Sequence, residues 1–532
     1  MADVVLLNDV FSSYDSSYRW SFWSRYLGPY AVKQSIIDKT LYDCIVIDYF
    51  TKHENFFEYL QTFVNEDTKY IGLSTTFLQH KENSRLNDFN LWFTNHNDTV
   101  EWFTKLKQIA PNAKIIIGGW TAEIWYNHYT MFRKSTPLPE AMQFVDYIVK
   151  GYGEIIVPSI INGTIPSQHI ITRDGVNFVS DNTSAGYGAQ VNPVKWNTND
   201  YVAPGEWLPL EISKGCRFGC KFCMFDKLGT TIIDKQALRE ELIHNYKNFG
   251  VTGYQLTDDT INDSIEKVQM VHEVFTSLPF DVEWIAYARP DMFQKYPEML
   301  DLMYEAGCRG MFLGIETFNH TAAKLCGKGL HPEKIKNILE WIKEKYGDEI
   351  FILGSFILGL PGETAESLED TLQYLKKQNV IDKILFEVFY VRPSETTAGE
   401  QKDYHTDNDK YQIRNIQFNP YYWEHGTLNY NQCQEISTRW KQVLTSARYS
   451  GHDRAIESST NFWSYPRMRS LGYSHIESFR MLKDASMPDT LYNKNNNWIK
   501  DYHRGVAKNY ERKILNTHKL QMAKRKTTKA FS

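Results

Sequence analysis

Three cysteines within eight residues, directly after a largely apolar run, constrain this chain more than any other feature. The run Leu208–Ile212 predicts a buried strand, and Cys216, Cys220 and Cys223 follow it with the spacing C-x3-C-x2-C. Thiolates are the usual protein ligands of iron–sulfur clusters, so a short loop that carries three of them can hold one face of a four-iron cluster. Such a cluster keeps one iron without a protein ligand, where a small molecule can bind.

Other uses of these cysteines agree less well with the pattern. Structural zinc takes four ligands, commonly as two C-x2-C pairs. A disulfide would leave one of the three cysteines over, and unrelated buried cysteines are a further interpretation. The remaining cysteines are isolated in the sequence: Cys44, Cys308, Cys326 and Cys433. The spacing therefore favours a cluster.

The same stretch resembles the signature of the radical S-adenosylmethionine (SAM) superfamily. That signature has this cysteine spacing and an aromatic residue before the third cysteine, which here is Phe222. The resemblance implies that Cys216, Cys220 and Cys223 hold a 4Fe–4S cluster and that SAM chelates its open iron. It also implies reductive cleavage of SAM to a 5′-deoxyadenosyl radical, which abstracts hydrogen from a substrate.

Length and composition bound the organisation of the chain. With 532 residues it is too long for one ordinary core, so we expect two to four domains. No apolar run reaches the roughly 18–20 residues of a membrane-spanning helix, and the N-terminus lacks the basic segment of a signal peptide. Seven cysteines, three of them in one motif, fit a reducing compartment. We therefore expect a cytoplasmic protein.

The first part of the chain, 1–160, alternates short buried strands with helical segments, which is typical of an α/β fold with a doubly wound, Rossmann-like parallel sheet. The strands are expected at Val4–Leu7, Cys44–Ile47, Tyr70–Ser74, Lys114–Ile117 and Val145–Lys150. Ligands of such sheets bind at the carboxyl ends of the strands. The candidate cofactor-binding residues at or just beyond these ends are Ser74, Thr75, Thr76, Gly118, Gly119, Gly151 and Glu154.

This order of features resembles the cobalamin-binding domain that precedes the radical SAM domain in one subfamily. The resemblance implies that the serine/threonine strand end and the paired glycines line a pocket for the cobalamin tail. The D-x-H-x-x-G loop of classical cobalamin domains, whose histidine ligates cobalt, is absent, since Asn8 and Asp9 follow the first strand without a nearby histidine. The resemblance thus implies a corrinoid held without that histidine. The alternative is a domain that keeps the fold only as a structural wall.

Turn signals dominate residues 161–205, which predicts a linker with one hairpin. From 206 to 398 the strand–helix alternation resumes, and six units fit a partial (β/α)6 barrel of the TIM type with its chemistry at the carboxyl ends of the strands. Its strands are expected at Leu208–Ile212, Gly253–Leu256, Val282–Ala286, Gly310–Ile315, Ile350–Ile357 and Ile384–Tyr390. The cysteine loop follows the first of them.

Polar residues recur at the ends of the later barrel strands. Asp258 and Asp259 follow the second strand, where the superfamily holds the methionine amino group of SAM. Arg289 follows the third strand and could pair with the SAM carboxylate. Glu316 follows the fourth and could hydrogen-bond a ribose hydroxyl or the amine, and the turn Gly359–Thr364 would flank the adenine. Each has a structural alternative, such as a helix cap or an internal ion pair.

Residues 399–532 are predicted to form a mainly helical C-terminal region with a basic tail. Trp423, His425 and Thr427 resemble a Trp-x-His-x-Thr element of cobalamin-type relatives that could floor a substrate pocket, although ordinary aromatic packing explains them equally. From Asp501 to Ser532, nine Lys and Arg residues oppose two acidic ones. Such a tail can contact phosphate backbones or be a solvated terminus.

Together, these resemblances imply a cobalamin-dependent radical SAM enzyme, with methyl transfer to an unactivated carbon as the first expectation. A low-potential electron donor such as flavodoxin or ferredoxin is the implied partner. Alternatives are a radical rearrangement or oxidation without methyl transfer, modification of a nucleotide or nucleic acid through the basic tail, and a non-catalytic protein that keeps the cluster. A methylthiotransferase would need further N-terminal cysteines, and Cys44 stands alone. Substrates from small molecules to nucleic acids stay open.

Overall fold

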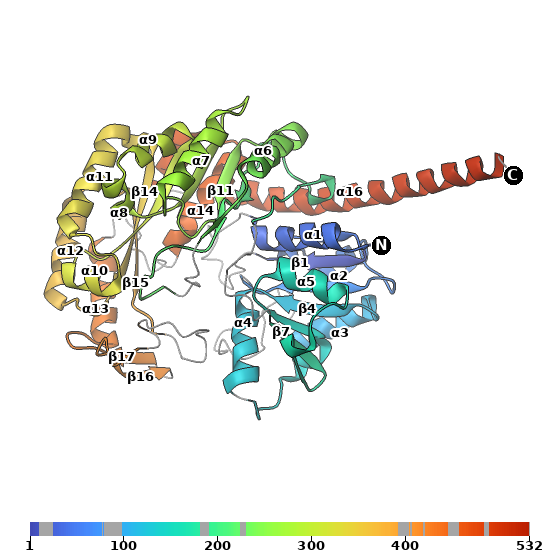
Figure 1. Ribbon diagram of the computed structural model, residues 1–532, viewed down its shortest axis with the longest axis horizontal. Helices are drawn as coiled ribbons and strands as arrows, with labels where there is room; N and C mark the ends of the chain where they lie inside the picture. Colours follow the sequence, from blue (N-terminus) through green and yellow to red (C-terminus); the bar gives the residue numbers. More distant parts are fainter. Residues whose placement is uncertain are drawn as a thin grey trace.

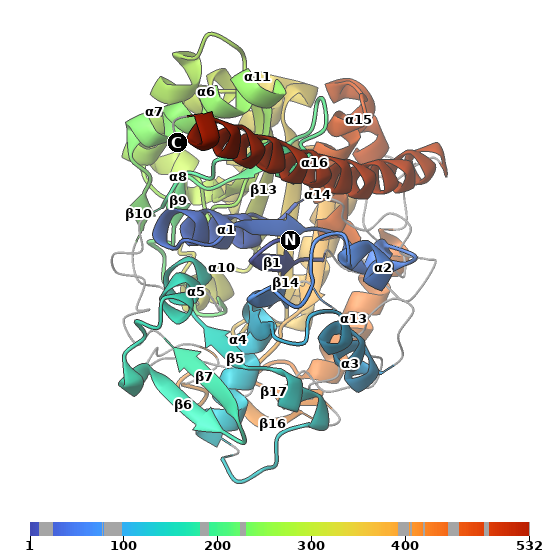
Figure 2. The same cartoon turned by 90° about the vertical axis from the view of Figure 1, so that its right-hand side faces the viewer.

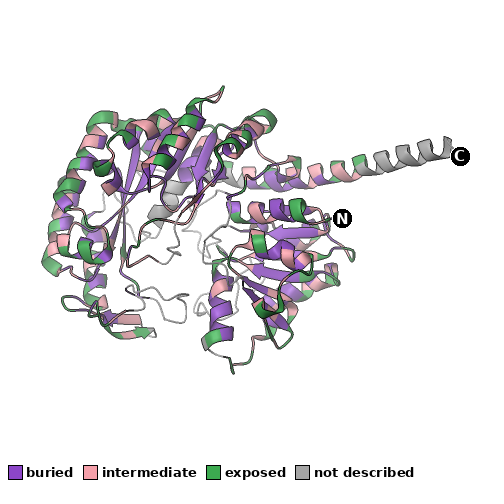
Figure 3. Cartoon of the chain, viewed as in Figure 1, coloured by how far each residue is buried: buried purple, intermediate pink, exposed green. Residues whose placement is uncertain are grey.

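Two sheets organise the protein, a mainly parallel one in the N-terminal domain and a parallel one in the central domain (Figure 1). The structure is a computed structural model. It describes residues 1–9, 25–76, 78, 98–132, 134–180, 191–223, 230–391, 404, 407–418, 421–444, 457–483 and 489–530. Buried residues are concentrated in the strands of both sheets, where Figure 3 shows them in purple.

The N-terminal sheet has the strand order β2-β1-β3-β4-β5-β7-β6 among the described residues. Its strands are β1 (Val4–Leu7), β2 (Cys44–Ile47), β3 (Tyr70–Ser74), β4 (Lys114–Gly118), β5 (Tyr147–Lys150), β6 (Ile170–Arg173) and β7 (Val176–Ser180). Strands β1 to β5 pair in parallel, as the sequence predicted. The order reverses between β1 and β3, and open sheets of this kind bind ligands at that reversal.

The hairpin of β6 and β7 lies in the segment that was predicted as a linker. Tyr147–Lys150 pairs in parallel with Asn177–Ser180, so the first sheet continues to Ser180 rather than ending near residue 160 (Figure 2). The hairpin covers the edge of β5, whose backbone groups would otherwise be open for pairing. The turn at Asp174 and Gly175 marks a hairpin in the sequence, but a turn cannot show which sheet the hairpin joins.

Alternate residues of the N-terminal strands pack on opposite faces of the sheet, as the two-residue period of a strand requires. On one face, Leu6 and Ile116 pack with residues of α1 (Leu27–Lys39) and α5 (Gly153–Ile161). On the other, Leu7 and Ile117 pack with α2 (Phe56–Leu60), α3 (Thr99–Ile109) and α4 (Trp120–Asn127). The sheet is therefore covered on both sides, which confirms the doubly wound architecture.

The central sheet is entirely parallel, with the consecutive order β15-β14-β13-β12-β11-β8 in the described chain. Its strands are β8 (Leu208–Leu210), β11 (Gly253–Leu256), β12 (Glu283–Ala288), β13 (Cys308–Glu316), β14 (Phe351–Leu358) and β15 (Lys383–Val388). The helices between them are α6 (Lys235–Phe249), α7 (Ile265–Thr276), α8 (Pro290–Lys295), α9 (Glu298–Glu305), α10 (His320–Cys326), α11 (Pro332–Tyr346) and α12 (Ala365–Lys377). Strands β8 and β15 are the two edges, so the barrel is partial, as predicted.

The C-terminal region is mainly helical, as predicted. Its elements are β16 (Arg414–Phe418), β17 (Tyr421–Glu424), α13 (Tyr430–Val443), α14 (Glu457–Ser470), α15 (His475–Lys483) and α16 (Asp489–Ala530). Helix α14 packs against β11 and β15. Helix α16 is 42 residues long, and Figure 1 shows its C-terminal half projecting from the body of the molecule. The basic stretch predicted as a tail is thus the end of this helix.

A buried arginine ties the domains together. Arg25, which precedes α1, lies 2.8 Å from a carboxylate oxygen of Glu206 and donates to the carbonyl of Asp200 at 2.6 Å. Its guanidinium also lies 4.9 Å from the ring centre of Tyr502 on α16. The N-terminal domain, the linker and α16 therefore share one buried polar cluster. Within the described residues, no helix is long and apolar enough to cross a bilayer.

Candidate functional site

The cysteine loop begins where the first barrel strand ends. Strand β9 (Ser213–Lys214) pairs with β10 (Thr231–Ile232) and closes a short hairpin around it. Cys220 is buried, whereas Cys216 and Cys223 are half-buried. The loop is held from behind, since the N–H of Lys221 donates to the carbonyl of Cys326 at 2.9 Å. Three thiols on one braced loop, two of them half-buried, fit a cluster that is held by one face.

Two of these cysteines already have polar neighbours. The thiol of Cys216 lies 3.8 Å from the hydroxyl of Thr260, and Arg289 Nη1 donates to Cys220 Sγ at 3.0 Å. In the part of the chain that the structure describes, no three His, Cys, Asp or Glu side chains gather around a point as they would for a single metal ion. Three thiolates on one loop are a donor set for an iron–sulfur cluster, whereas structural zinc takes four ligands.

The two aspartates after β11 have different surroundings. Asp258 is buried, accepts the N–H of Ile212 at 3.0 Å and the hydroxyl of Ser213, and thereby fixes the segment that leads into the cysteine loop. Asp259 is only half-buried. Burial and the neighbouring Asp258 raise the pKa of Asp259 to about 6. Of the two predicted SAM-binding carboxylates, Asp259 is thus the one that remains accessible.

Sequence reasoning missed the cation that sits behind this turn. Lys267 of α7 is fully buried, and its ammonium lies 2.8 Å from Asp263 and 3.9 Å from Asp258. It also donates to the carbonyl of Thr260 at 2.6 Å. A buried lysine inside a helix carries no sequence signal of its own. It compensates the charge of the carboxylates that shape the end of β11.

Arg289, predicted to pair with the SAM carboxylate, points its guanidinium fork elsewhere. Its Nε and Nη2 bind the two carboxylate oxygens of Asp291 at 3.0 and 2.7 Å. The remaining Nη1 contacts Cys220. The structure therefore places Arg289 beside the cluster loop, in the internal ion pair that the sequence left as its alternative.

Glu316 sits at a strained backbone position. Its φ of 68° lies in the left-handed region, at a bulge where β13 and β14 change register. Lys328 lies 3.3 Å from the Glu316 carboxylate and donates to the carbonyl of Gly314 at 2.8 Å. Lys328 was not predicted, although the flanking Gly327 and Gly329 mark a loop there. This pair faces the same end of the barrel as the cysteine loop and stays a predicted SAM contact.

The Trp-x-His-x-Thr element packs behind the glycine turn after β14. His425 Nε2 lies 3.1 Å from the carbonyl of Gly359, and its ring stacks on Trp423 with 5.3 Å between ring centres. Thr427 donates to the carbonyl of Glu363. The Glu363 carboxylate accepts the N–H of Gly359 at 2.7 Å, and burial raises its pKa to about 7. The element thus braces the turn, in agreement with the packing alternative.

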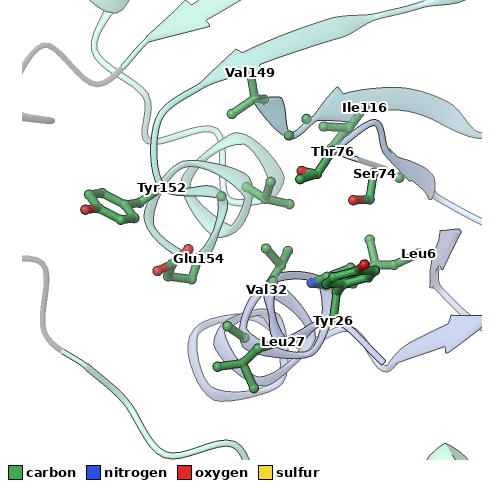
Figure 4. A pocket seen from close by; sticks show the side chains of 18 of the residues that line it. Leu6, Tyr26, Leu27, Val32, Ser74, Thr76, Ile116, Val149, Tyr152 and Glu154 are labelled. Atoms are coloured by element: carbon green, nitrogen blue, oxygen red, sulfur yellow. The ribbon is translucent and has the colours of Figure 1, made fainter. Parts of the chain in front are cut away.

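A cavity of roughly 410 Å³ opens in the N-terminal domain, between the sheet and helices α1 and α5. It lies at the carboxyl ends of β1, β3, β4 and β5, where the strand order reverses. Its inner part is apolar and is lined by Val4, Leu6, Val32, Ile116, Val149 and Val157. Figure 4 shows Leu6 and Val32 facing Ile116 across this space, with the Ser74 and Thr76 side chains at the strand ends.

Gly72 leaves room for the Leu6 side chain at the wall of this cavity. A Cβ there would lie 2.5 Å from Leu6 Cδ2, which is too close unless the leucine moves. Gly119 has a φ of 97°, and a Cβ there would meet Thr76 Oγ1 at 2.6 Å. Close packing at both positions therefore requires glycine. Leu6 therefore packs over Gly72, and both residues line the cavity.

Most of the predicted cofactor-binding residues line this cavity, namely Ser74, Thr76, Gly118, Gly119, Gly151 and Glu154. Thr75 does not. Its hydroxyl donates to the carbonyl of Gly118 at 2.9 Å and accepts the N–H of Ala122 at 3.1 Å, so it joins β3, β4 and α4. A hydroxyl residue within a serine/threonine run can serve either the ligand or the backbone, and the sequence does not distinguish the two.

Three residues of the barrel complete the cavity: Glu211, Lys214 and Thr257. Lys214 forms an ion pair with Glu154 of α5 and lies 3.4 Å from Glu211 Oε2. Burial raises the pKa of Glu211 to about 7, although Lys214 opposes the shift. Lys214 is two residues before Cys216 in the sequence. The cavity of the first domain and the cysteine loop of the second are therefore adjacent.

Comparisons with known proteins agree with this architecture. Residues 210–375 match the family model of the radical SAM superfamily. The chain is 24% identical over 292 residues to an uncharacterised methyltransferase of Pyrococcus horikoshii, which covers 52% of this chain and 60% of that protein. It therefore spans about three fifths of the length of this curated relative.

Two solved structures share nearly the whole fold. One is TsrM, a radical SAM methyltransferase from Kitasatospora setae with cobalamin and a 4Fe–4S cluster bound, at a TM-score of 0.57 and 13% identity over 91% of this chain and 100% of that chain. The other is OxsB, a cobalamin-dependent SAM radical enzyme with aqua-cobalamin and SAM bound, at a TM-score of 0.52 and 12% identity over 98% and 81%.

Residues 210–375, most of the central domain, form a radical SAM domain. The chain's arrangement of a doubly wound domain, a partial barrel and a helical C-terminal region is that of the cobalamin-dependent members TsrM and OxsB. The predicted family and fold class are thereby confirmed.

Proposed function

We propose that this protein is a cobalamin-dependent radical SAM enzyme that transfers a methyl group to an unactivated carbon of its substrate. One observation carries the proposal: the cavity at the strand ends of the first domain is completed by Glu211, Lys214 and Thr257 of the barrel. A ligand in this cavity would therefore lie next to the loop of Cys216 and its two companions. A radical SAM site and a cofactor pocket that adjoin in this way suit chemistry that uses both.

The three cysteines would hold the cluster, and nearby polar groups would hold SAM against its open iron. Asp259 and the Glu316–Lys328 pair offer a carboxylate and an ammonium for the charged ends of the SAM methionine. When bound, the cluster supplies the electron that cleaves SAM to a 5′-deoxyadenosyl radical, and cobalamin supplies the methyl group. A low-potential donor such as flavodoxin or ferredoxin would deliver the electron. All seven cysteines are free thiols, which suits a cytoplasmic location.

The cavity fits the tail of cobalamin. Its inner apolar part, where Leu6 packs over Gly72, suits the flat aromatic base at the end of that tail. The hydroxyls of Ser74 and Thr76 and the exposed backbone at Gly119 offer hydrogen bonds to the polar chain that leads to it. The described residues that line the cavity include no histidine, so we propose a corrinoid held without one.

The relatives support the same assignment. The Pyrococcus protein is named a methyltransferase, and TsrM is a methyltransferase whose structure contains both cobalamin and a cluster. OxsB was solved with cobalamin and SAM together. These names describe those proteins, and the match of fold extends the proposal to this chain.

Anaerobic reconstitution of the full chain tests the proposal. We expect about four irons, a similar amount of sulfide and one cobalamin per chain, with SAM cleaved under reductant. Cys220→Ala should lose the cluster and the cleavage while retaining cobalamin, because most residues that line the cavity belong to the N-terminal domain and Cys220 is not among them. Stoichiometric zinc without cleavage would contradict the proposal, and so would a Cys220→Ala variant that still cleaves SAM.

A further inference from the structure

Arg289 is held in direct contact with one of the cluster cysteines. It follows β12, is 4% exposed, and its Nη1 donates to Cys220 Sγ at 3.0 Å. An arginine is always charged in proteins, so this is a charge-assisted hydrogen bond to sulfur.

Several contacts fix the guanidinium in this orientation. Asp291 binds the other side of the fork through two hydrogen bonds of 3.0 and 2.7 Å. The ring of Phe218, which lies between the first two cysteines, covers the guanidinium at 3.8 Å from its centre. Asn262 binds both the N–H and the carbonyl of Arg289, at 2.9 Å each. A SAM carboxylate could take this fork only by displacing Asp291.

We propose that Arg289 is a positioning residue that raises the reduction potential of the cluster through its hydrogen bond to Cys220. The inference rests on the proposed function, because it requires a cluster on the three cysteines. A cluster that accepts one electron gains one negative charge, part of which resides on the cysteine sulfurs. A cation that donates a hydrogen bond to one of these sulfurs stabilises the reduced form more than the oxidised form. Because Arg289 is buried, solvent screens this electrostatic effect little.

The consequence concerns the electron donor. A higher potential lets a donor of moderate strength reduce a larger fraction of the cluster. Asp291 partly neutralises Arg289, and it holds Nη1 on the sulfur rather than on the substrate side. Arg289 therefore acts on the ease of reduction, whereas Asp259, Glu316 and Lys328 are placed to act on SAM binding.

A redox titration of the reconstituted full-length protein without SAM tests the inference. The reduced fraction is followed by the electron paramagnetic resonance signal of the reduced cluster. At the potential where the wild-type cluster is half reduced, Arg289→Gln should show a ratio of reduced to oxidised cluster at least tenfold lower, which is about 59 mV for a one-electron couple. Arg289→Lys keeps the charge but not the forked guanidinium, so its ratio of reduced to oxidised cluster should lie between those of the wild type and Arg289→Gln.

Arg309→Gln is the matched control. Arg309 is also partly buried and ion-paired, with Glu283 at 3.4 Å, but both residues stand at the amino ends of β12 and β13. The cysteine loop lies at the opposite, carboxyl end of the barrel. This variant should titrate like the wild type.

The outcomes separate the inference from the proposed function. A wild-type protein without a four-iron cluster would overturn both. A wild-type protein with the cluster, and an Arg289→Gln variant with the same cluster and midpoint, would overturn the inference alone. If that variant also loses the spectral change on SAM addition, Arg289 is a SAM ligand instead. If Arg289→Gln fails to assemble the cluster, the midpoint potential of Arg289→Lys is the deciding measurement. An Arg289→Lys midpoint equal to that of the wild type overturns the inference.

Discussion

Lys214 of β9 and Glu154 of α5 form an ion pair that crosses from the barrel to the doubly wound domain at the edge of the cavity. Their side chains are only 8% and 14% exposed. Glu211 lies 3.4 Å from the same ammonium. One lysine thus neutralises two carboxylates, one from each domain, beside the proposed cobalamin site. Its loss should loosen both the domain contact and the cavity.

Lys214→Met should destabilise the protein and speed cobalamin release. Removing one partner of a nearly buried ion pair typically costs on the order of 3 kcal/mol. Burial already raises the pKa of Glu211 to about 7, so this carboxyl loses its proton as pH rises from 6 to 8. The loss of stability of Lys214→Met relative to the wild type should therefore grow over this range. Thermal melting and the rate of cobalamin loss on gel filtration measure the two effects. Lys39→Met is the control, because the Lys39 ammonium donates to the Glu154 carbonyl at an exposed site and not to its carboxylate.

Gly72→Ala should lower cobalamin affinity, because the added methyl group would push the Leu6 side chain into the cavity. The added Cβ would lie 2.5 Å from Leu6 Cδ2, so the leucine must turn within the cavity it lines. The double variant Leu6→Ala/Gly72→Ala makes room for the new methyl and should regain part of the affinity. Equilibrium binding of hydroxocobalamin, followed by absorbance, measures both. Equal affinities of the wild type and Gly72→Ala would show that the cobalamin tail does not occupy the part of the cavity next to Gly72.

Mutations of the two aspartates after β11 should have different effects, one on stability and the other on SAM binding. Asp258→Asn leaves buried Lys267 with only Asp263 as a carboxylate partner, so we expect a loss of about 3 kcal/mol in stability. Asp259→Asn should leave the melting temperature nearly unchanged and weaken SAM binding at least tenfold, because Asp259 is only half-buried and stays accessible to a ligand. Melting curves and SAM binding to the reconstituted protein distinguish them. The reverse pattern would assign SAM to Asp258.

The sequence predicted the strand ends but not the direction in which adjacent side chains point. The run Ser74–Thr76 lies at the edge of the cavity, yet Thr75 turns to the backbone while its two neighbours line the cavity. Asp258 and Asp259 differ in the same way. Successive residues of a strand point to opposite sides, and one residue of register decides which side is buried. Single-sequence patterns do not fix that register at a strand end.

The sequence was also silent on the cations that complete the site. Lys214, Lys267 and Lys328 each pair with a carboxylate that was predicted to bind a cofactor or lies beside one. A lysine in a strand or helix is ordinary in composition, and only the tertiary fold shows that it is buried. The cysteine loop was predictable for the opposite reason, because its chemistry resides in local spacing alone.

Glu241 of α6 should make the protein less stable as pH rises, independently of the cofactors. It is 5% exposed, and burial raises the pKa of its carboxyl from 4.5 to about 8, although a hydrogen bond with the Val194 backbone opposes the shift. The folded protein therefore binds this proton more tightly than the unfolded chain does. Its stabilising contribution is complete below about pH 4.5 and is lost as pH rises to about 8, at up to about 1.4 kcal/mol per pH unit.

Glu241→Gln should remove this dependence, because the amide carries no charge and keeps an oxygen for the Val194 N–H. We expect the variant to melt above the wild type at pH 8 and close to it at pH 5, in the protein without cofactors. Glu240→Gln changes an exposed neighbour on the same helix, bonded to Gln236, and should follow the wild-type curve at every pH. If the melting temperatures of Glu241→Gln and the wild type differ by the same amount at every pH from 5 to 8, Glu241 is ionised in the folded protein throughout this range.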